Sequence, residues 1–216
     1  MIDLHTHSIF SDGELIPSEL VRRAKVKGYR AIAITDHGDH SNIEFIIPRV
    51  VKACRILSAL CDICVIPGIE LTHLPPECIA ELAEESRLLG ARLVVVHGET
   101  IVEPVISGTN AAALEAPIDI LAHPGLITEQ EAEMAFRNSV SLEITARRGH
   151  SLTNGHVARM ARAFRIALVL NTDSHAPDDL IDLDTARKIA RGAGMTDDEI
   201  DEMFRNAAHL LQKVQG

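Results

Sequence analysis

The sequence predicts an α/β fold, a TIM-barrel-like (β/α)7 barrel with seven parallel strands. Short runs rich in β-branched residues alternate along the 216-residue chain with segments of helical character. Right-handed crossovers close such βα units into a barrel. The apolar residues are mainly Ala, Ile, Leu and Val, and aromatic residues make up only 3%, as is typical of helices around a parallel sheet. An open doubly wound sheet is the alternative, but it calls for a phosphate-binding glycine turn after an early strand, and the sequence has none.

The expected elements follow one another at regular intervals. The strand runs are 1–7 (MIDLHTH), 31–37 (AIAITDH), 62–70 (DICVIPGIE), 92–99 (RLVVVHGE), 119–125 (DILAHPG), 141–146 (SLEITA) and 167–174 (ALVLNTDS). Helical segments include 17–28, 75–90, 128–139 and 196–214. The last of these is amphipathic and begins with the capping residue Thr196, followed by acidic residues in the first turn.

Length and charge limit the classes of function. The length suits one domain over residues 1–216. The formal charge of −10 disfavours broad adhesion to nucleic acid or to anionic membranes. No stretch is long and apolar enough to span a bilayer, and the N-terminus lacks a basic region followed by an apolar one, so we expect a cytoplasmic protein. There we expect the four cysteines to be free thiols.

Metal-binding residue types stand at the ends of the expected strands. Six of the seven runs end in such residues: His5, His7, His37, Glu70, His97, His123, Asp173 and His175. A single buried histidine is usually structural, but the carboxyl ends of parallel barrel strands meet at one rim, where active sites form. We therefore expect a cluster of two to three divalent transition-metal ions. Histidine with carboxylate ligands suits Zn, Mn or Fe.

The motifs DLHTHS, SDG, TDH, PGIE, VVHGE, AHPG and NTDSH, in this order, resemble the PHP (polymerase and histidinol phosphatase) family across nearly the whole chain. The resemblance implies a distorted seven-stranded barrel that holds up to three metals. It implies three ligand sets: His5, His7, Glu70 and Asp173; Glu70, His97 and His123; and Asp12, His37 and His175. Amidohydrolases commonly use a Lys after the fourth strand, where this chain has His97, and TatD-type deoxyribonucleases have no place for Asp12 and His37.

The resulting expectation is a metal-dependent phosphoesterase that hydrolyses a phosphate monoester of a small metabolite, as histidinol phosphatase does. A hydroxide between the two ions that share Glu70 attacks phosphorus, and Glu70, Asp173 and His175 are the expected catalytic residues. We expect Arg147, Arg148 and His150, after the sixth strand, to bind the substrate. Arg147 is the stronger arginine candidate because it shares a strand face with Glu143 and can grip phosphate with its planar fork. The alternative is an ordinary solvated arginine pair.

Two other functions are alternative hypotheses. A nuclease or nucleotide phosphoesterase uses the same centre, and nucleic acid would then enter only as a nucleotide or oligonucleotide substrate. A non-catalytic metal-binding module is a third possibility, disfavoured because all nine candidate ligands are present. We also expect Asp36, and in the same way Asp3, to orient a metal-bound histidine or water from behind. The substrate and the oligomeric state do not follow from the sequence.

Overall fold

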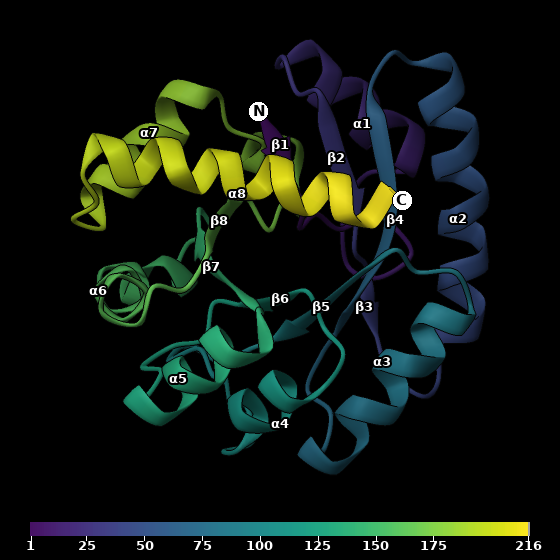
Figure 1. The fold of residues 1–216 in the computed structure, drawn as a ribbon. Helices are drawn as coiled ribbons and strands as arrows, with labels where there is room; N and C mark the ends of the chain where they lie inside the picture. The colour runs from purple at the N-terminus through teal and green to yellow at the C-terminus, as the bar shows by residue number, and fades with distance from the viewer. Residues whose placement is uncertain (216) are drawn as a thin grey trace.

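The computed structural model describes residues 1–215 and confirms the parallel α/β barrel (Figure 1). The strands are β1 (Ile2–Asp3), β2 (Ala31–Ile34), β3 (His37–Gly38), β4 (Cys64–Leu71), β5 (Leu93–His97), β6 (Ile120–Ala122), β7 (Ser141–Thr145) and β8 (Leu168–Asn171). They pair in parallel in the order β1-β2-β4-β5-β6-β7-β8, and the short β3, which follows β2, also pairs with β4. A parallel bridge between Thr6 and Ser174 brings the two edges together, so the sheet nearly closes on itself.

Helices surround the sheet (Figure 1). They are α1 (Pro17–Val26), α2 (Ile43–Leu60), α3 (Ile79–Leu88), α4 (Thr109–Glu115), α5 (Glu129–Asn138), α6 (Asn154–Phe164), α7 (Leu183–Gly192) and α8 (Asp197–Gln215). The four helical segments expected above correspond to α1, α3, α5 and α8. Thr128 and Glu131 form a capping box at α5, and the Thr196 hydroxyl accepts from the Glu199 backbone N–H at α8 (3.4 Å). No helix in residues 1–215 has both the length and the apolar character to cross a membrane.

Strand residues alternate between two apolar clusters. On β2, Ile32 and Ile34 face the surrounding helices, whereas Ala31 and Ala33 belong to a cluster inside the barrel. The small alanine side chains suit the crowded interior, where side chains from several strands share the space. The four cysteines are free thiols, and Cys54 packs in the outer cluster.

Helix α8 closes one end of the barrel. Its residues Ala207, Leu210, Leu211 and Val214 join the interior cluster together with apolar side chains from the strands. Figure 1 shows this helix crossing the ring of strands, with the C-terminus beside β4. We call the end closed by α8 the plugged end and the opposite end the open end. Active sites of such barrels lie at the carboxyl ends of the strands, so we expect the site at the open end.

The first strand is less regular than expected. Regular pairing covers only Ile2–Asp3, and the chain then continues beside the segment after β8: Asp173 N–H donates to the His5 carbonyl (3.0 Å) and His7 N–H to the Ser174 carbonyl (2.9 Å). Asp3 was expected to orient a metal-bound histidine or water, but none of its hydrogen bonds among residues 1–215 goes to a histidine ring. Its carboxylate accepts from the hydroxyl of Thr172 (2.6 Å) and from the backbone N–H of His5 (3.3 Å), so it ties the first strand to the last.

Candidate metal centre

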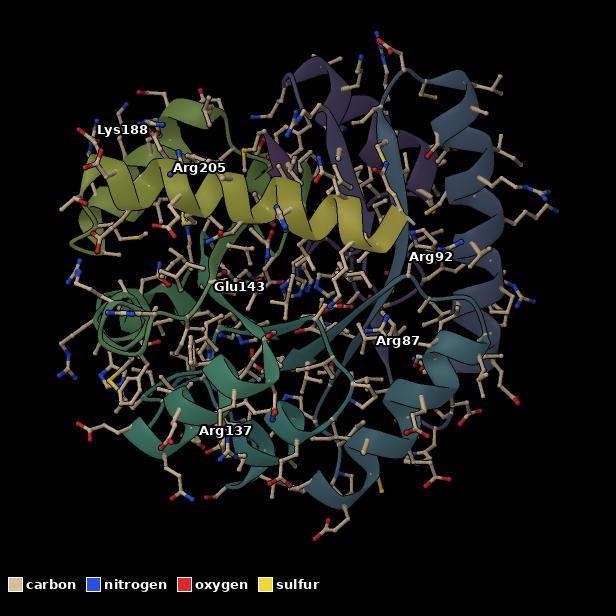
Figure 2. All side chains as sticks on the ribbon, viewed as in Figure 1. Arg87, Arg92, Arg137, Glu143, Lys188 and Arg205 are labelled. Atoms are coloured by element: carbon tan, nitrogen blue, oxygen red, sulfur yellow. The ribbon has the colours of Figure 1, made fainter. Side chains whose placement is uncertain are left out.

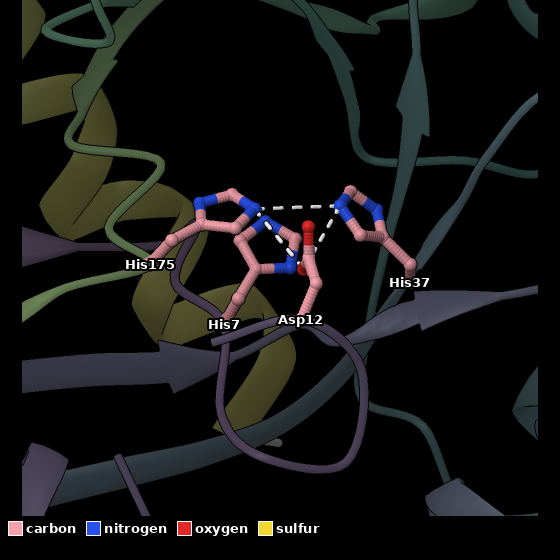
Figure 3. Close-up of side chains that lie close together, drawn as sticks. All are labelled: His7, Asp12, His37 and His175. Carbon is pink, nitrogen blue, oxygen red and sulfur yellow. Dashed lines mark hydrogen bonds and ion pairs between the residues drawn. The ribbon is translucent and has the colours of Figure 1, made fainter. Parts of the chain in front are cut away.

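Four predicted residues, two of them from the loop after β1, meet at the open rim (Figure 3). The Nε2 atoms of His175 and His37 lie 3.2 and 3.4 Å from Oδ1 of Asp12, and 3.4 Å from each other. His7 completes a group whose ligand atoms all lie within 4.8 Å of one another. The expected set was Asp12, His37 and His175, so the structure adds His7 to it.

The loop that carries Asp12 is held by Asp36. This carboxylate accepts from the backbone N–H and hydroxyl of Ser8 (both 2.7 Å) and from the hydroxyl of Ser11 (2.8 Å). Gly13 allows the loop to turn tightly, because a Cβ there would lie 2.5 Å from the His7 carbonyl oxygen. Asp36 was expected to orient a metal-bound histidine or water. Among residues 1–215 these hydrogen bonds go to Ser8 and Ser11 and not to a histidine ring, so the carboxylate fixes the SDG loop, and hence the position of Asp12.

A second, fully buried group lies deeper in the barrel. Oε1 of Glu70 is 3.3 Å from Nε2 of His5 and 3.6 Å from Nε2 of His123. Oδ1 of Asp173 is 3.1 Å from Nε2 of His7. Glu70 has no exposed surface and lies among several candidate ligands, which is the geometry that a bridging carboxylate requires.

Glu143 supports this group and has no assigned role in the sequence prediction. Its Oε2 accepts from Nδ1 of His5 (2.8 Å) and from the side-chain amide of Asn171 (2.9 Å). Because Nδ1 of His5 is used in this way, Nε2 is directed to Glu70. Figure 2 shows Glu143 toward the interior, whereas Arg137 and Lys188 lie at the periphery. One feature of the sequence could have predicted this role. The run 141–146 is the one expected strand without a candidate ligand at its end, and Glu143 is its only acidic residue.

A third group lies beside the second. His97, His123 and His150 are all buried, and their ligand atoms lie within 4.8 Å of one another. Glu103 reaches this group from the segment between β5 and α4, with Oε2 3.1 Å from Nε2 of His97 and 3.1 Å from Nε2 of His73. The sequence prediction missed Glu103, because no motif or strand periodicity singles out a residue in this long connection.

Burial and neighbouring charges set the protonation of the centre. Burial lowers the pKa of His7 and of His123 well below the usual value, which favours neutral imidazole. Burial also raises the pKa of Asp173 to about 7. Burial alone would raise the pKa of Glu70, but the charges of His5 and His37 outweigh it and lower that pKa well below its ordinary value.

The residues present fit divalent transition metals. Buried side-chain atoms that make no hydrogen bond within residues 1–215 include Nδ1 of His7, Nδ1 of His123, Oε1 of Glu70 and Oδ1 of Asp173. Unpaired buried polar atoms cost free energy and call for a partner. Imidazole and carboxylate donors are the ligands that Zn, Mn and Fe accept, and neutral imidazole is the form that binds.

The backbone is strained at two candidate ligands. His123 has φ of 29° and Asp173 has φ of 51°, a region that non-glycine residues seldom adopt. Each sits where a strand ends and the chain turns at the rim. Strain of this kind is found at sites where function fixes a side chain's position.

A cavity of about 380 Å³ opens above the centre, and its lining includes Arg147, His150, Asp12, His175 and Glu103. Arg147 is the only arginine or lysine in this lining, and its Nη1 lies 3.3 Å from Oδ2 of Asp179. Arg148 is exposed and is not part of the lining. Of the three expected substrate-binding residues, the structure brings Arg147 and His150 to the cavity and leaves Arg148 outside.

Similarity to known proteins agrees with this geometry. The PHP domain family matches residues 3–97. An uncharacterized protein of Methanocaldococcus jannaschii is 53% identical over 215 residues, which cover 98% of this chain and 99% of that protein. A protein of Escherichia fergusonii named as a probable phosphatase is 27% identical, over 92% of this chain and 88% of its own.

Solved structures are similar at the level of the fold. A chain of archaeal ribonuclease P, determined with mature tRNA, superposes with a TM-score of 0.76 at 15% identity, over 98% of this chain and 90% of its own. Histidinol phosphate phosphatase from Lactococcus lactis, determined with zinc, L-histidinol and phosphate, superposes with a TM-score of 0.60 at 17% identity, over 90% and 94%.

Proposed function

Because the chain belongs to the PHP family of metal-dependent phosphoesterases, we propose that it hydrolyses the phosphate monoester of a small metabolite, as a histidinol phosphatase does. The observation that carries the proposal is the convergence of buried histidines and carboxylates beneath a cavity that contains one arginine. We also propose that residues 1–216 form one domain and that the protein acts in the cytoplasm.

Up to three ions would be held by the nine candidate ligands: His5, His7, Asp12, His37, Glu70, His97, His123, Asp173 and His175. When bound, divalent ions would supply an activated water for attack on phosphorus and neutralise the charge of the phosphoryl oxygens. Glu70 and Asp173 would hold the ions together, since each lies within 4 Å of several candidate ligand nitrogens. His175 would fix the outer ion, because its Nδ1 donates to the Asp173 carbonyl and its Nε2 faces Asp12.

Arg147 would bind the substrate phosphate. Its guanidinium lines the cavity next to the candidate ligands and is held by Asp179. A guanidinium donates two parallel hydrogen bonds to phosphate oxygens. It also supplies positive charge in a protein of net charge −10, which an anionic substrate would otherwise avoid.

The size of the cavity favours a small substrate. About 380 Å³ is at the lower end of the range for small-molecule sites, roughly 300 to 1,000 Å³. The negative net charge disfavours a long nucleic-acid chain, which binds mainly through its phosphates. A nuclease or nucleotide phosphoesterase remains the second candidate, and a non-catalytic metal-binding module the third.

A substrate screen tests the proposal. The Mn-loaded protein is incubated with phosphorylated metabolites, mononucleotides, bis-phosphorylated nucleotides and short oligonucleotides, and released phosphate or cleaved strands are measured. We expect phosphate release from one class of small monoesters, with at least about a hundredfold less from the Glu70→Gln variant. Cleavage of oligonucleotides or bis-phosphorylated nucleotides alone would favour the second candidate. Metal uptake without any hydrolysis would favour the third.

A further inference from the structure

Glu103 and His150 stand out because neither belongs to the nine expected ligands, yet both point at the same place. Oε1 of Glu103 lies 3.3 Å from Nε2 of His150, and Oε2 lies 3.1 Å from Nε2 of His97. His123 packs against both histidines, with ring centroids 4.2 Å from His150 and 4.4 Å from His97. We call His97, His123, His150 and Glu103 the rim quartet.

We propose that the rim quartet holds one divalent transition-metal ion, so that His150 and Glu103 are metal ligands and not substrate contacts. The inference rests on the proposed function, since it concerns one ion of the same centre. It differs from the family-based expectation that Glu70, His97 and His123 share this ion. In the structure His97 pairs with Glu103, and no ion pair joins it to Glu70 within residues 1–215.

Neighbouring groups orient two of the imidazoles toward the site. Nδ1 of His97 donates to the Gly98 carbonyl (3.1 Å), which leaves Nε2 as its metal-binding nitrogen. Nδ1 of His150 is paired with the Thr100 hydroxyl (2.8 Å), so its Nε2 likewise faces Glu103. Metal-bound histidines usually make such a hydrogen bond through the second ring nitrogen. Gly98 and Thr100 belong to the same segment as Glu103, so one stretch of chain organises the site.

All three histidines of the rim quartet are buried. In addition, Nδ1 of His123 is buried and makes no hydrogen bond among the described residues. The rim quartet therefore offers three buried imidazoles together with one carboxylate.

The spacing is close to that of ligands on one ion. Ligand atoms about 2.0 Å from a tetrahedral Zn²⁺ lie roughly 3.3 Å apart. Oε2 of Glu103 lies 3.1 Å from Nε2 of His97, its other oxygen, Oε1, lies 3.3 Å from Nε2 of His150, and the ligand atoms of the three histidines lie within 4.8 Å of one another. Three nitrogens and one oxygen form a set that zinc accepts. His73, whose Nε2 is 3.1 Å from Oε2 of Glu103, acts as a positioning residue for the carboxylate.

Metal titration tests the assignment. The protein is stripped with chelator and titrated with Zn²⁺, with bound ions counted by elemental analysis after dialysis and affinities measured by calorimetry. We expect Glu103→Gln and His150→Gln to lose one ion per chain, or to bind one ion at least about tenfold more weakly, while the other ions bind as in the wild type. Co²⁺ titration should show a matching loss of visible absorption from one tetrahedral site.

The chain offers matched controls. Glu115→Gln and His40→Gln replace exposed residues outside the rim quartet and should keep full uptake. Glu103 is partly exposed on a connecting segment, so its variant is expected to fold, which thermal unfolding of the metal-free protein checks. If both rim variants bind the wild-type number of ions with wild-type affinity, the assignment is overturned although the proposed function can stand. If the wild type binds no ion, both fail.

Discussion

The two ends of the barrel use the same interior in opposite ways. At one end, Leu210 and Leu211 of α8 fill the space between the strands with apolar atoms. At the other end, the same strands present histidines and carboxylates, several of whose buried atoms make no hydrogen bond among residues 1–215. Apolar burial stabilises the fold, whereas unpaired buried polar atoms destabilise it. The contrast teaches that apolar packing at the end closed by α8 offsets the free-energy cost of the polar residues at the open end.

Removal of metal should produce the largest effect. Chelation of all bound ions is expected to reduce phosphatase activity to background, because the attacking water and the charge neutralisation are both lost. Ions that bind only the folded state add about 2.7 kcal/mol at a hundredfold excess over Kd, so the unfolding midpoint should also fall by roughly 5 to 10 °C. Re-addition of Mn²⁺ should restore both. Full activity after verified removal would contradict the role of the open end.

Glu70→Gln should be the most damaging single substitution at the open end. Glu70 is fully buried and contacts several candidate ligands, whereas the side chain of Asp12 is 59% exposed and belongs to one group. We expect kcat/KM to fall at least about a hundredfold for Glu70→Gln and about tenfold for Asp12→Asn. Metal content measured alongside should fall further in the first variant. Equal losses would argue against a bridging carboxylate.

Leu211→Ala tests the plugged end. Loss of its buried methyl groups should lower the free energy of unfolding by about 2 kcal/mol, the lower part of the range for such changes, because the side chain is not wholly enclosed. Metal content and kcat/KM at low temperature should stay close to the wild type. Leu88→Ala, at a residue that is 88% exposed, is the matched control and should change stability by less than about 0.5 kcal/mol. Urea unfolding measures both.

Arg147→Ala should separate substrate binding from metal binding. Loss of charge-assisted hydrogen bonds of about 1.5 to 3 kcal/mol corresponds to roughly a ten- to hundredfold fall in kcat/KM. Metal content should be unchanged, and Arg147→Lys should recover only part of the loss, because an ammonium lacks the planar fork. Arg148→Ala should behave as the wild type. If Arg148→Ala shows the loss and Arg147→Ala behaves as the wild type, Arg148 and not Arg147 binds the phosphate.

Most of the fold could be predicted from local patterns. Apolar runs that alternate with amphipathic segments follow directly from the βα unit, and the capping residue Thr196 marks a helix start as expected. The irregular β1 could not be predicted, because its pairing depends on the distant segment around Ser174. The short β3 was missed for a similar reason, since it exists only by pairing with β4.

The candidate site was predictable where residues follow strands. His97 and His123 stand at strand ends, and parallel strands bring such positions to one rim. Glu103 lies in a connecting segment with no periodicity, so only the folded chain places it against the histidines. The contact of Asp36 with the SDG loop was also unpredictable, because a carboxylate next to a histidine in sequence can turn to either side.

The closure of the barrel by α8 affects how fast the chain folds. Barrel closure joins residues far apart in sequence: the Leu4 backbone N–H donates to the Asn171 side chain across 167 positions. The interior cluster needs α8, the last helix of the described chain. Non-local contacts of this kind slow folding, because a long loop must be closed before the contacts form. Until α8 docks, the apolar side chains of the interior cluster are exposed to water and to other chains. Docking of α8 buries this surface and thereby lowers the tendency of the folding chain to aggregate.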